Sequence, residues 1–165
     1  MVENNVGKVI GKEMIIYGID PGFSGAWGAI NHHGNFKGCG DMYHTEKHLR
    51  TNDIFEEMSS IRGKEDCEVV VESVHSMPQQ GVASVFKFGV AFGGALALAE
   101  RMRCPWHLVT PQVWKKSFGL TSDKHASSIL ARKLWPDAPL ARQKDNGRAE
   151  ALLMAYWWLK QHGND

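Results

Sequence analysis

The stretch "MIIYGIDPGFSGAWGAIN", residues 14 to 31, contains two short apolar runs separated by a turn. Residues 14–20 and 25–31 are strand-like, and "PGFS" between them has the turn chemistry of an antiparallel connection. A third run, residues 36–43, follows the turn "HHGN". This order predicts that the domain begins with three antiparallel strands.

The pattern downstream alternates between helical and strand-like segments. Helical patterns cover residues 45–61, about 82–102, 112–117, 122–134 and 146–162, and strand patterns cover 67–72 and 106–110. Parallel strands need a crossover connection, which the helical segments supply. We therefore expect an α/β fold: a mixed five-stranded sheet, three antiparallel strands followed by parallel strands, with helices on both faces.

The chain has 165 residues, 43% of them hydrophobic, which is enough for one core without a metal or disulfide. We expect one domain, residues 14–165, after a loose N-terminal extension, residues 1–13, that lacks the apolar core of a signal peptide. The apolar stretch 88–99 is too short to cross a bilayer. Cys39, Cys67 and Cys104 are expected to be reduced thiols of a cytoplasmic protein.

The net charge of +1 conceals an uneven distribution of charge along the chain. Residues 101–150 contain ten basic and four acidic side chains, whereas residues 45–72 contain four basic and eight acidic ones. A basic surface suits a polyanionic partner such as nucleic acid, although lysines scattered on solvated helix faces explain any one of them equally well.

Two acidic residues end apolar strands, and two more flank the start of the last helix. Asp20 and Glu72 are expected at the same end of neighbouring strands, although Asp20 before Pro-Gly could also be a turn residue. Glu150 falls on the apolar face of the last helix, where an unpaired carboxylate is costly. Asp145 is placed to cap that helix and could be cap and ligand together. Converging carboxylates with oxygen donors only predict Mg²⁺ or Mn²⁺ rather than zinc.

Five motifs resemble those of the RuvC family of Holliday junction resolvases, in the ribonuclease H-like superfamily. In chain order they are "GIDPGFSGAWGAI", "VVVESVHSMPQQG", "VASVFKFGVAFGGALAL", "VTPQVWKKSFGL" and "KDNGRAEALLMA". The resemblance runs from about residue 14 to residue 158. Glycine at position 147, where bacterial members usually have aspartate, is closer to the bacteriophage and plastid branch.

The resemblance implies a ribonuclease H-like endonuclease that resolves four-way DNA junctions. Asp20, Glu72, Asp145 and Glu150 would hold two Mg²⁺ ions, with Mn²⁺ as a substitute, and would hydrolyse a phosphodiester near the crossover. The resemblance also implies a symmetric homodimer that makes paired nicks in DNA recombination and repair. We also expect no membrane and no small-molecule cofactor. In the absence of a targeting signal, the expected location is the cytoplasm of a bacterial cell or phage-infected host, with an organelle not excluded. Gly89, Gly93 and Ala97 would let two helices approach closely, but packing on the protein's own sheet explains them equally well.

Lysines and a loop are the expected contacts to DNA. Lys115 or Lys116 would lie near the scissile phosphate, with Lys124 as a second choice, although simple phosphate positioning is the alternative. His75 could instead be a proton shuttle, and Met77 could pack into the core. The full set of predicted DNA contacts is His75, Met77, Gln79, Gln80, Gly81, Lys87, Lys124 and Arg148.

Two other classes of function compete with a resolvase. The "GID-G" turn also occurs at the phosphate loop of actin-like and sugar-kinase ATPases, but such proteins need two related domains and 165 residues supply one. The other class is a branched nucleic-acid binding protein that does not cut, or a nuclease selective for a different branched DNA or RNA.

Overall fold

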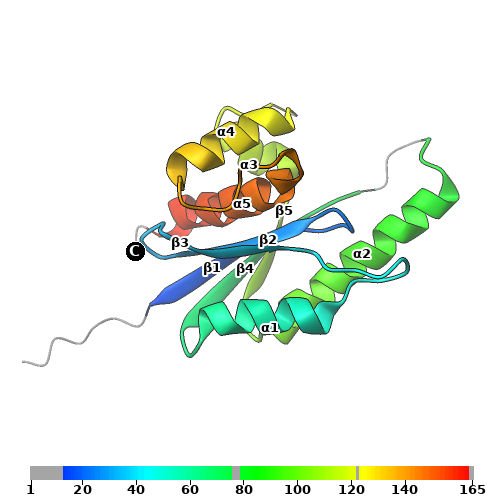
Figure 1. Cartoon of the computed structure of the whole chain (residues 1–165), viewed down its shortest axis with the longest axis horizontal. Helices are drawn as coiled ribbons and strands as arrows, with labels where there is room; N and C mark the ends of the chain where they lie inside the picture. The colour runs from blue at the N-terminus through cyan, green and yellow to red at the C-terminus, as the bar shows by residue number, and fades with distance from the viewer. Residues whose placement is uncertain (1–12, 76–78, 122, 164–165) are drawn as a thin grey trace, which may run out of the picture.

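A single five-stranded sheet lies at the centre of the protein (Figure 1). The structure, a computed structural model, describes residues 13–75, 79–121 and 123–163, except for the side chain of residue 124. The strands are β1 (Met14–Asp20), β2 (Ala26–Asn31), β3 (Phe36–Asp41), β4 (Asp66–Glu72) and β5 (Trp106–Val109). Their order in the sheet is β3-β2-β1-β4-β5, with β1, β2 and β3 antiparallel and β1, β4 and β5 parallel. The predicted mixed sheet is confirmed.

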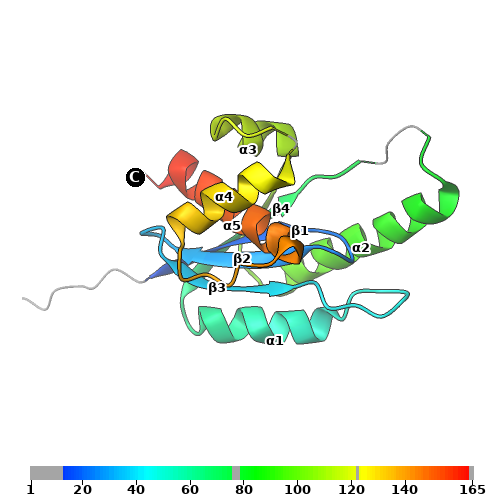
Figure 2. The ribbon, with the colours of Figure 1, turned by 45° about the horizontal axis from the view of Figure 1, so that its top comes forward.

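Helices cover the sheet on both faces, as the sequence predicted (Figures 1 and 2). One face carries α1 (Thr51–Arg62) and α2 (Val82–Arg101); the other carries α3 (Pro111–Ser117), α4 (Lys124–Leu134) and α5 (Asn146–His162). A short 3-10 turn, η1 (Gln143–Asp145), leads directly into α5. Each face of the sheet therefore contributes to its own hydrophobic core.

Helix α5 lies between the sheet and α4 (Figure 1). Seven consecutive residues, 149–155, are buried because the helix is covered on two sides. Two glycines in the strands make this close approach feasible. A Cβ on Gly18 would stand 1.8 Å from the Ala151 carbonyl oxygen, and one on Gly28 would stand 2.7 Å from Cγ of Leu152. The close packing fixes the start of α5 relative to the end of β1.

Helix α1 starts six residues later than the sequence pattern suggested. In the loop before it, the Thr45 hydroxyl oxygen accepts hydrogen bonds from the backbone amides of Lys47 and His48, each 3.2 Å long. His44 and Leu49 also form an isolated antiparallel bridge. Local side-chain bonding of this kind competes with helix formation, so the predicted helix over residues 45–50 was wrong.

The cysteines differ from the expectation of three free thiols. Cys67 and Cys104 form a disulfide with a Cα–Cα distance of 5.7 Å, across 37 residues of sequence. The pairing follows from the sheet, because β4 begins next to Cys67 and its parallel neighbour β5 begins just after Cys104. Cys39 is the free cysteine of the described chain, and burial raises the pKa of its thiol to about 11.

Helix α2 is packed along only part of its length. Ala91, Ala95, Leu98 and Ala99 are buried against the sheet, while the N-terminal half extends beyond the sheet (Figure 1). By length and composition this one helix of the described chain could cross a bilayer, a test that core helices of soluble proteins also pass.

Candidate functional site

Asp20 and Glu72 lie side by side at one edge of the sheet. The parallel register pairs Ile19 with Val71, so the next residue of each strand is an acid. Gly22, with φ at +140°, turns the chain away directly after Asp20. Glu72 is 7% exposed, although it ends its strand. The sequence prediction that the two acids share one end of the sheet is confirmed.

Glu150 is brought to the same edge by α5. It is 5% exposed, in agreement with its predicted position on the buried face of the helix. One turn earlier, the position that a Cβ on Gly147 would take is 3.3 Å from Oδ2 of Asp20. The first turn of α5 is therefore directly against the Asp20 carboxylate, where the positive end of the helix dipole favours negative charge.

Two consecutive residues of α3 bind two of these carboxylates. The fully buried Trp114 donates its indole N–H to Oε1 of Glu72 at 3.0 Å. The ammonium of Lys115 is 2.8 Å from Oε1 of Glu150, and the two side chains are 15% and 7% exposed. The hydroxyl of Ser127, on α4, donates to the same Glu150 oxygen at 3.3 Å. Neighbouring residues of α3 therefore contact Glu72 and Glu150.

Trp114 and Ser127 were not predicted as site residues. A tryptophan in a seven-residue helix and a serine in an amphipathic helix are ordinary core and surface residues by pattern. No spacing in the sequence reveals that both point at acids 42 and 23 residues away. The closest available signal is the position of Trp114 immediately before the predicted lysine pair.

Asp145 has a different set of partners. It is 2% exposed, and Arg142 binds it through the guanidinium at 2.7 Å and through the backbone amide at 2.8 Å. These hydrogen bonds hold the pKa of Asp145 below its ordinary value, against the opposing effect of burial. Asp145 precedes α5 as predicted, but its side chain does not cap that helix, because it closes the capping box of η1.

The donors at this edge fit a hard divalent cation in type, since the acidic side chains offer only oxygen. Glu150 also has a cationic partner in the structure, the ammonium of Lys115, as a buried carboxylate requires. Among the described residues, however, no three histidine, cysteine or acidic side chains are gathered closely enough to hold one ion. Of the four predicted ligands, Asp20, Glu72 and Glu150 lie at the same end of the sheet without forming a closed cluster, and Asp145 is bound to Arg142.

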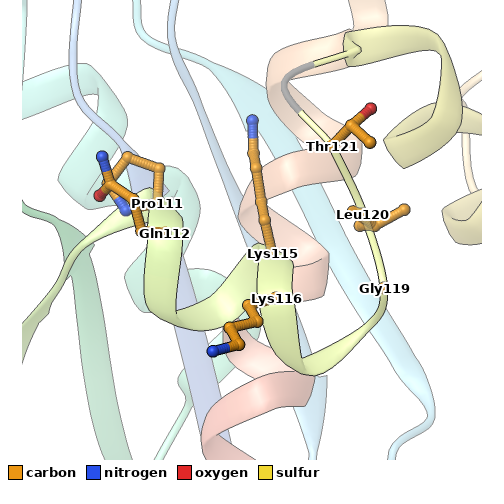
Figure 3. Close-up of a pocket in the computed structure, with 7 residues that line it drawn as sticks. All are labelled: Pro111, Gln112, Lys115, Lys116, Gly119, Leu120 and Thr121. Atoms are coloured by element: carbon orange, nitrogen blue, oxygen red, sulfur yellow. The ribbon is translucent and has the colours of Figure 1, made fainter.

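An open pocket of about 730 Å³ has Lys115, the partner of Glu150, in its lining (Figure 3). Its lining comes from α3 and the segment after it: Pro111, Gln112, Lys115, Lys116, Gly119, Leu120 and Thr121. Lys115 and Lys116 leave the helix in different directions (Figure 3). Lys116 is exposed, whereas Lys115 is paired with Glu150. The structure therefore assigns different surroundings to two lysines that the sequence could not distinguish.

The predicted DNA contacts are spread over several elements. His75, Gln79, Gln80 and Gly81 are exposed in the segment between β4 and α2, and Lys87 is exposed on α2. Met77 and the side chain of Lys124 lie outside the described part of the chain.

Arg148 differs from the other predicted DNA contacts. Its side chain is 14% exposed and is bound to Asp41 at 2.7 Å. That ion pair ties the end of β3 to α5, and a role for Arg148 in DNA binding stays a prediction.

The fold is similar to that of solved RuvC structures. A structure of RuvC from T. thermophilus, solved in complex with a Holliday junction substrate, aligns with a TM-score of 0.61 at 18% identity, over 91% of this chain and 97% of that one. A second structure of Thermus thermophilus RuvC gives a TM-score of 0.54 at 19% identity, over 90% and 96% of the two chains. No protein-family model matches the sequence, and no curated protein matches it. The comparison shows a RuvC-like fold.

Proposed function

We propose that this protein is a crossover junction endodeoxyribonuclease, a structure-selective enzyme that resolves four-way DNA junctions by metal-dependent hydrolysis of phosphodiester bonds. The observation that supports this most is that Asp20, Glu72 and Glu150 lie at the same end of a RuvC-like sheet, with a lysine on Glu150. An ATPase of the actin-like kind has less support, because two solved structures that match the fold are RuvC structures.

The acids would hold two Mg²⁺ ions, or Mn²⁺ in their place. Asp20, Glu72 and Glu150 are the ligands that we propose, and Asp145 would join them only after leaving Arg142. When bound, the ions would activate a water molecule and stabilise the leaving 3′ oxygen. Trp114 would keep the Glu72 carboxylate in one orientation through its indole N–H.

Lys115 has two partners in this proposal. In the structure its ammonium is 2.8 Å from Oε1 of Glu150. With the acids bound to metal, the ammonium would turn toward the scissile phosphate and offset the charge that develops there. Lys116, which leaves α3 in a different direction and is exposed, would contact DNA only as a phosphate-positioning cation.

We also propose that the protein acts in the cytoplasm and belongs to the bacteriophage and plastid branch of the family. Gly147 supports the branch, because its missing side chain leaves the space next to the Asp20 carboxylate without a further acid.

A homodimer is the assembly we propose, with α2 at its interface. Val82 is 88% exposed and Phe86 is 72% exposed. Among the described residues nothing lies within 4 Å of a Cβ placed on Gly89 or Gly93, so this small-residue stripe does not pack on the protein's own sheet. An apolar, open helix face suits a second copy of the chain, and a two-fold dimer matches a two-fold junction.

The test is a nicking assay with Mg²⁺ on a four-way junction, a fork and a linear duplex of the same sequence. We expect paired symmetric nicks on the junction, which Asp20→Asn abolishes while junction binding is retained. Asp137→Asn, an exposed aspartate in the loop after α4, is the matched control and should cut normally. Equal cutting of linear duplex would refute junction selectivity. Junction binding without cutting, in Mg²⁺ and in Mn²⁺, would instead identify a binding protein.

A further inference from the structure

The turn after β1 carries an aromatic ring that is contacted by two other segments. Phe23 is partly buried against the core of the α1 and α2 face. The imidazole of His44, from the loop after β3, stacks on it with ring centroids 5.0 Å apart and planes 21° apart. The ammonium of Lys87, on α2, is 5.1 Å from the centre of the same ring. A histidine, a phenylalanine and a lysine from distant parts of the sequence thus form one cluster.

Two surface hollows meet at Phe23 and Ser24. The first, of about 360 Å³, is lined by Phe23, Ser24, Gly25, Asp41, Met42, Tyr43, His44 and Lys144. The second, of about 230 Å³, is lined by Gly22, Phe23, Ser24, Gln80, Ser84, Lys87, Phe88 and Ala91. Each hollow therefore has one lysine at its wall and the aromatic ring of Phe23 at the boundary between them.

The charges around the hollows favour an anion. Lys87 and Lys144 are both exposed. The acid in the first hollow, Asp41, is offset by Arg148 at 2.7 Å. A second acid near this hollow, Glu57, accepts a hydrogen bond at 2.9 Å from the hydroxyl of Tyr43, which is 37% exposed.

The combination of rings and cations is typical of surfaces that bind unpaired nucleotides. Aromatic rings stack on any base, because every base has a π face, while lysines contact the phosphates between them. Phe23 is three residues after Asp20, so their Cα atoms are at most about 11 Å apart. One DNA strand could therefore touch the candidate acid site and this cluster together.

We propose that the Phe23–His44 stack, with Lys87 and Lys144, holds an unpaired base of the branched DNA next to the acid site. The base stacks on His44, and the two lysines contact the flanking phosphates. This inference rests on the proposed function and adds a contact that distinguishes an open crossover from a paired duplex. In this proposal Phe23, His44, Lys87 and Lys144 hold the DNA strand in place, and none of them touches the reacting phosphate.

The test measures binding of the Asp20→Asn protein, so that no cutting interferes, with and without His44→Ala. The probes are a four-way junction, a linear duplex and a single strand of the same sequence. We expect His44→Ala to weaken binding of the junction and the single strand by roughly 5- to 150-fold, the effect of losing one stacked base, and to leave duplex binding unchanged. His44→Phe should restore binding, because the stack survives without the imidazole.

A matched control is His33→Ala. His33 is also an exposed histidine in contact with another ring, that of His32, with the planes tilted by 42°, but it lies in the turn between β2 and β3. His33→Ala should bind all three probes with the same affinity as the Asp20→Asn protein does. Lys144→Gln should weaken the junction complex and lower the salt dependence of its affinity by about one counterion.

The possible results separate this inference from the proposed function. Unchanged junction binding by His44→Ala, or an equal loss on duplex and junction, would overturn the stacking role. Junction binding by His44→Phe that is as weak as that of His44→Ala would also overturn the stacking role. Another outcome is that the Asp20→Asn protein shows no preference for the junction over duplex, while His44→Ala still weakens binding of the single strand. That result would support the stacking surface and refute the proposed junction selectivity.

Discussion

Replacing Lys115 with methionine removes the cationic partner of a buried carboxylate and keeps most of the side chain's packing. Lys115 Nζ is 2.8 Å from Glu150 Oε1, with the two side chains 15% and 7% exposed. Breaking a buried ion pair by removing one partner costs about 3 to 5 kcal/mol. Lys115 lines an open pocket, so one partner of the pair is close to solvent, and we expect the lower end, about 3 kcal/mol.

The measurement is urea unfolding of the native protein and of Lys115→Met, with chelator and then with millimolar Mg²⁺. A loss of about 3 kcal/mol moves the midpoint by roughly 1 to 3 M urea. Mg²⁺ bound by the acids would supply the positive charge that Lys115 supplied, so the difference between the two proteins should narrow when Mg²⁺ is added. Binding to the folded state at 100 times the dissociation constant is worth about 2.7 kcal/mol.

Two further variants test whether the ion pair is the source of the stability difference. Lys116→Met changes an exposed lysine on the same helix and should stay within about 0.5 kcal/mol of the native protein. In a double-mutant cycle with Glu150→Gln, the coupling between positions 115 and 150 should be about 1 to 3 kcal/mol. Coupling near zero would refute the ion pair as a source of stability. If Mg²⁺ does not reduce the difference in the free energy of unfolding between the native protein and Lys115→Met, that result would count against metal binding at Glu150.

Three other predictions concern assembly, oxidation and acid stability. Phe86→Glu should convert a dimer into a monomer in light scattering, because it puts a charge on the exposed apolar half of α2. Reducing the Cys67–Cys104 disulfide should lower the free energy of unfolding by about 2 to 4 kcal/mol, measured by urea unfolding with and without reductant. Arg142→Ala should destabilise the protein most near neutral pH. Since Arg142 lowers the pKa of Asp145, its contribution is present above the ordinary aspartate pKa and is lost as the pH falls through the lowered value.

Each of these predictions has a control. Ile129→Glu, at a 55% exposed position on α4, should leave the dimer intact, and a monomeric native protein would refute the assembly. Thiol counting in denaturant should find one reactive cysteine before reduction and three after it; three before reduction would contradict the disulfide. A stability difference between native protein and Arg142→Ala that stays constant into acid would show that Asp145 is not the partner involved.

Much of the site could be predicted from the sequence because its acids stand at ends of regular elements. Asp20 and Glu72 follow apolar runs whose pairing is set by chain order, so their meeting follows from the topology of the sheet. Glu150 follows from helical periodicity alone. The loop at 45–50 was mistaken for helix because Thr45 bonds locally to amides that a helix would otherwise use.

The sequence by itself determined the mixed sheet of three antiparallel strands followed by parallel strands, the helices on both faces, and the meeting of Asp20 and Glu72 at one end of the sheet, because these depend on periodicity and on where each element ends. Only the tertiary structure decided which lysine binds Glu150, that Trp114 holds Glu72, that Asp145 belongs to Arg142 and that Cys67 meets Cys104. Those choices depend on side-chain direction and on distances between elements remote in sequence. The physical reason is that periodicity specifies the face on which a residue lies, whereas packing specifies which atom lies opposite.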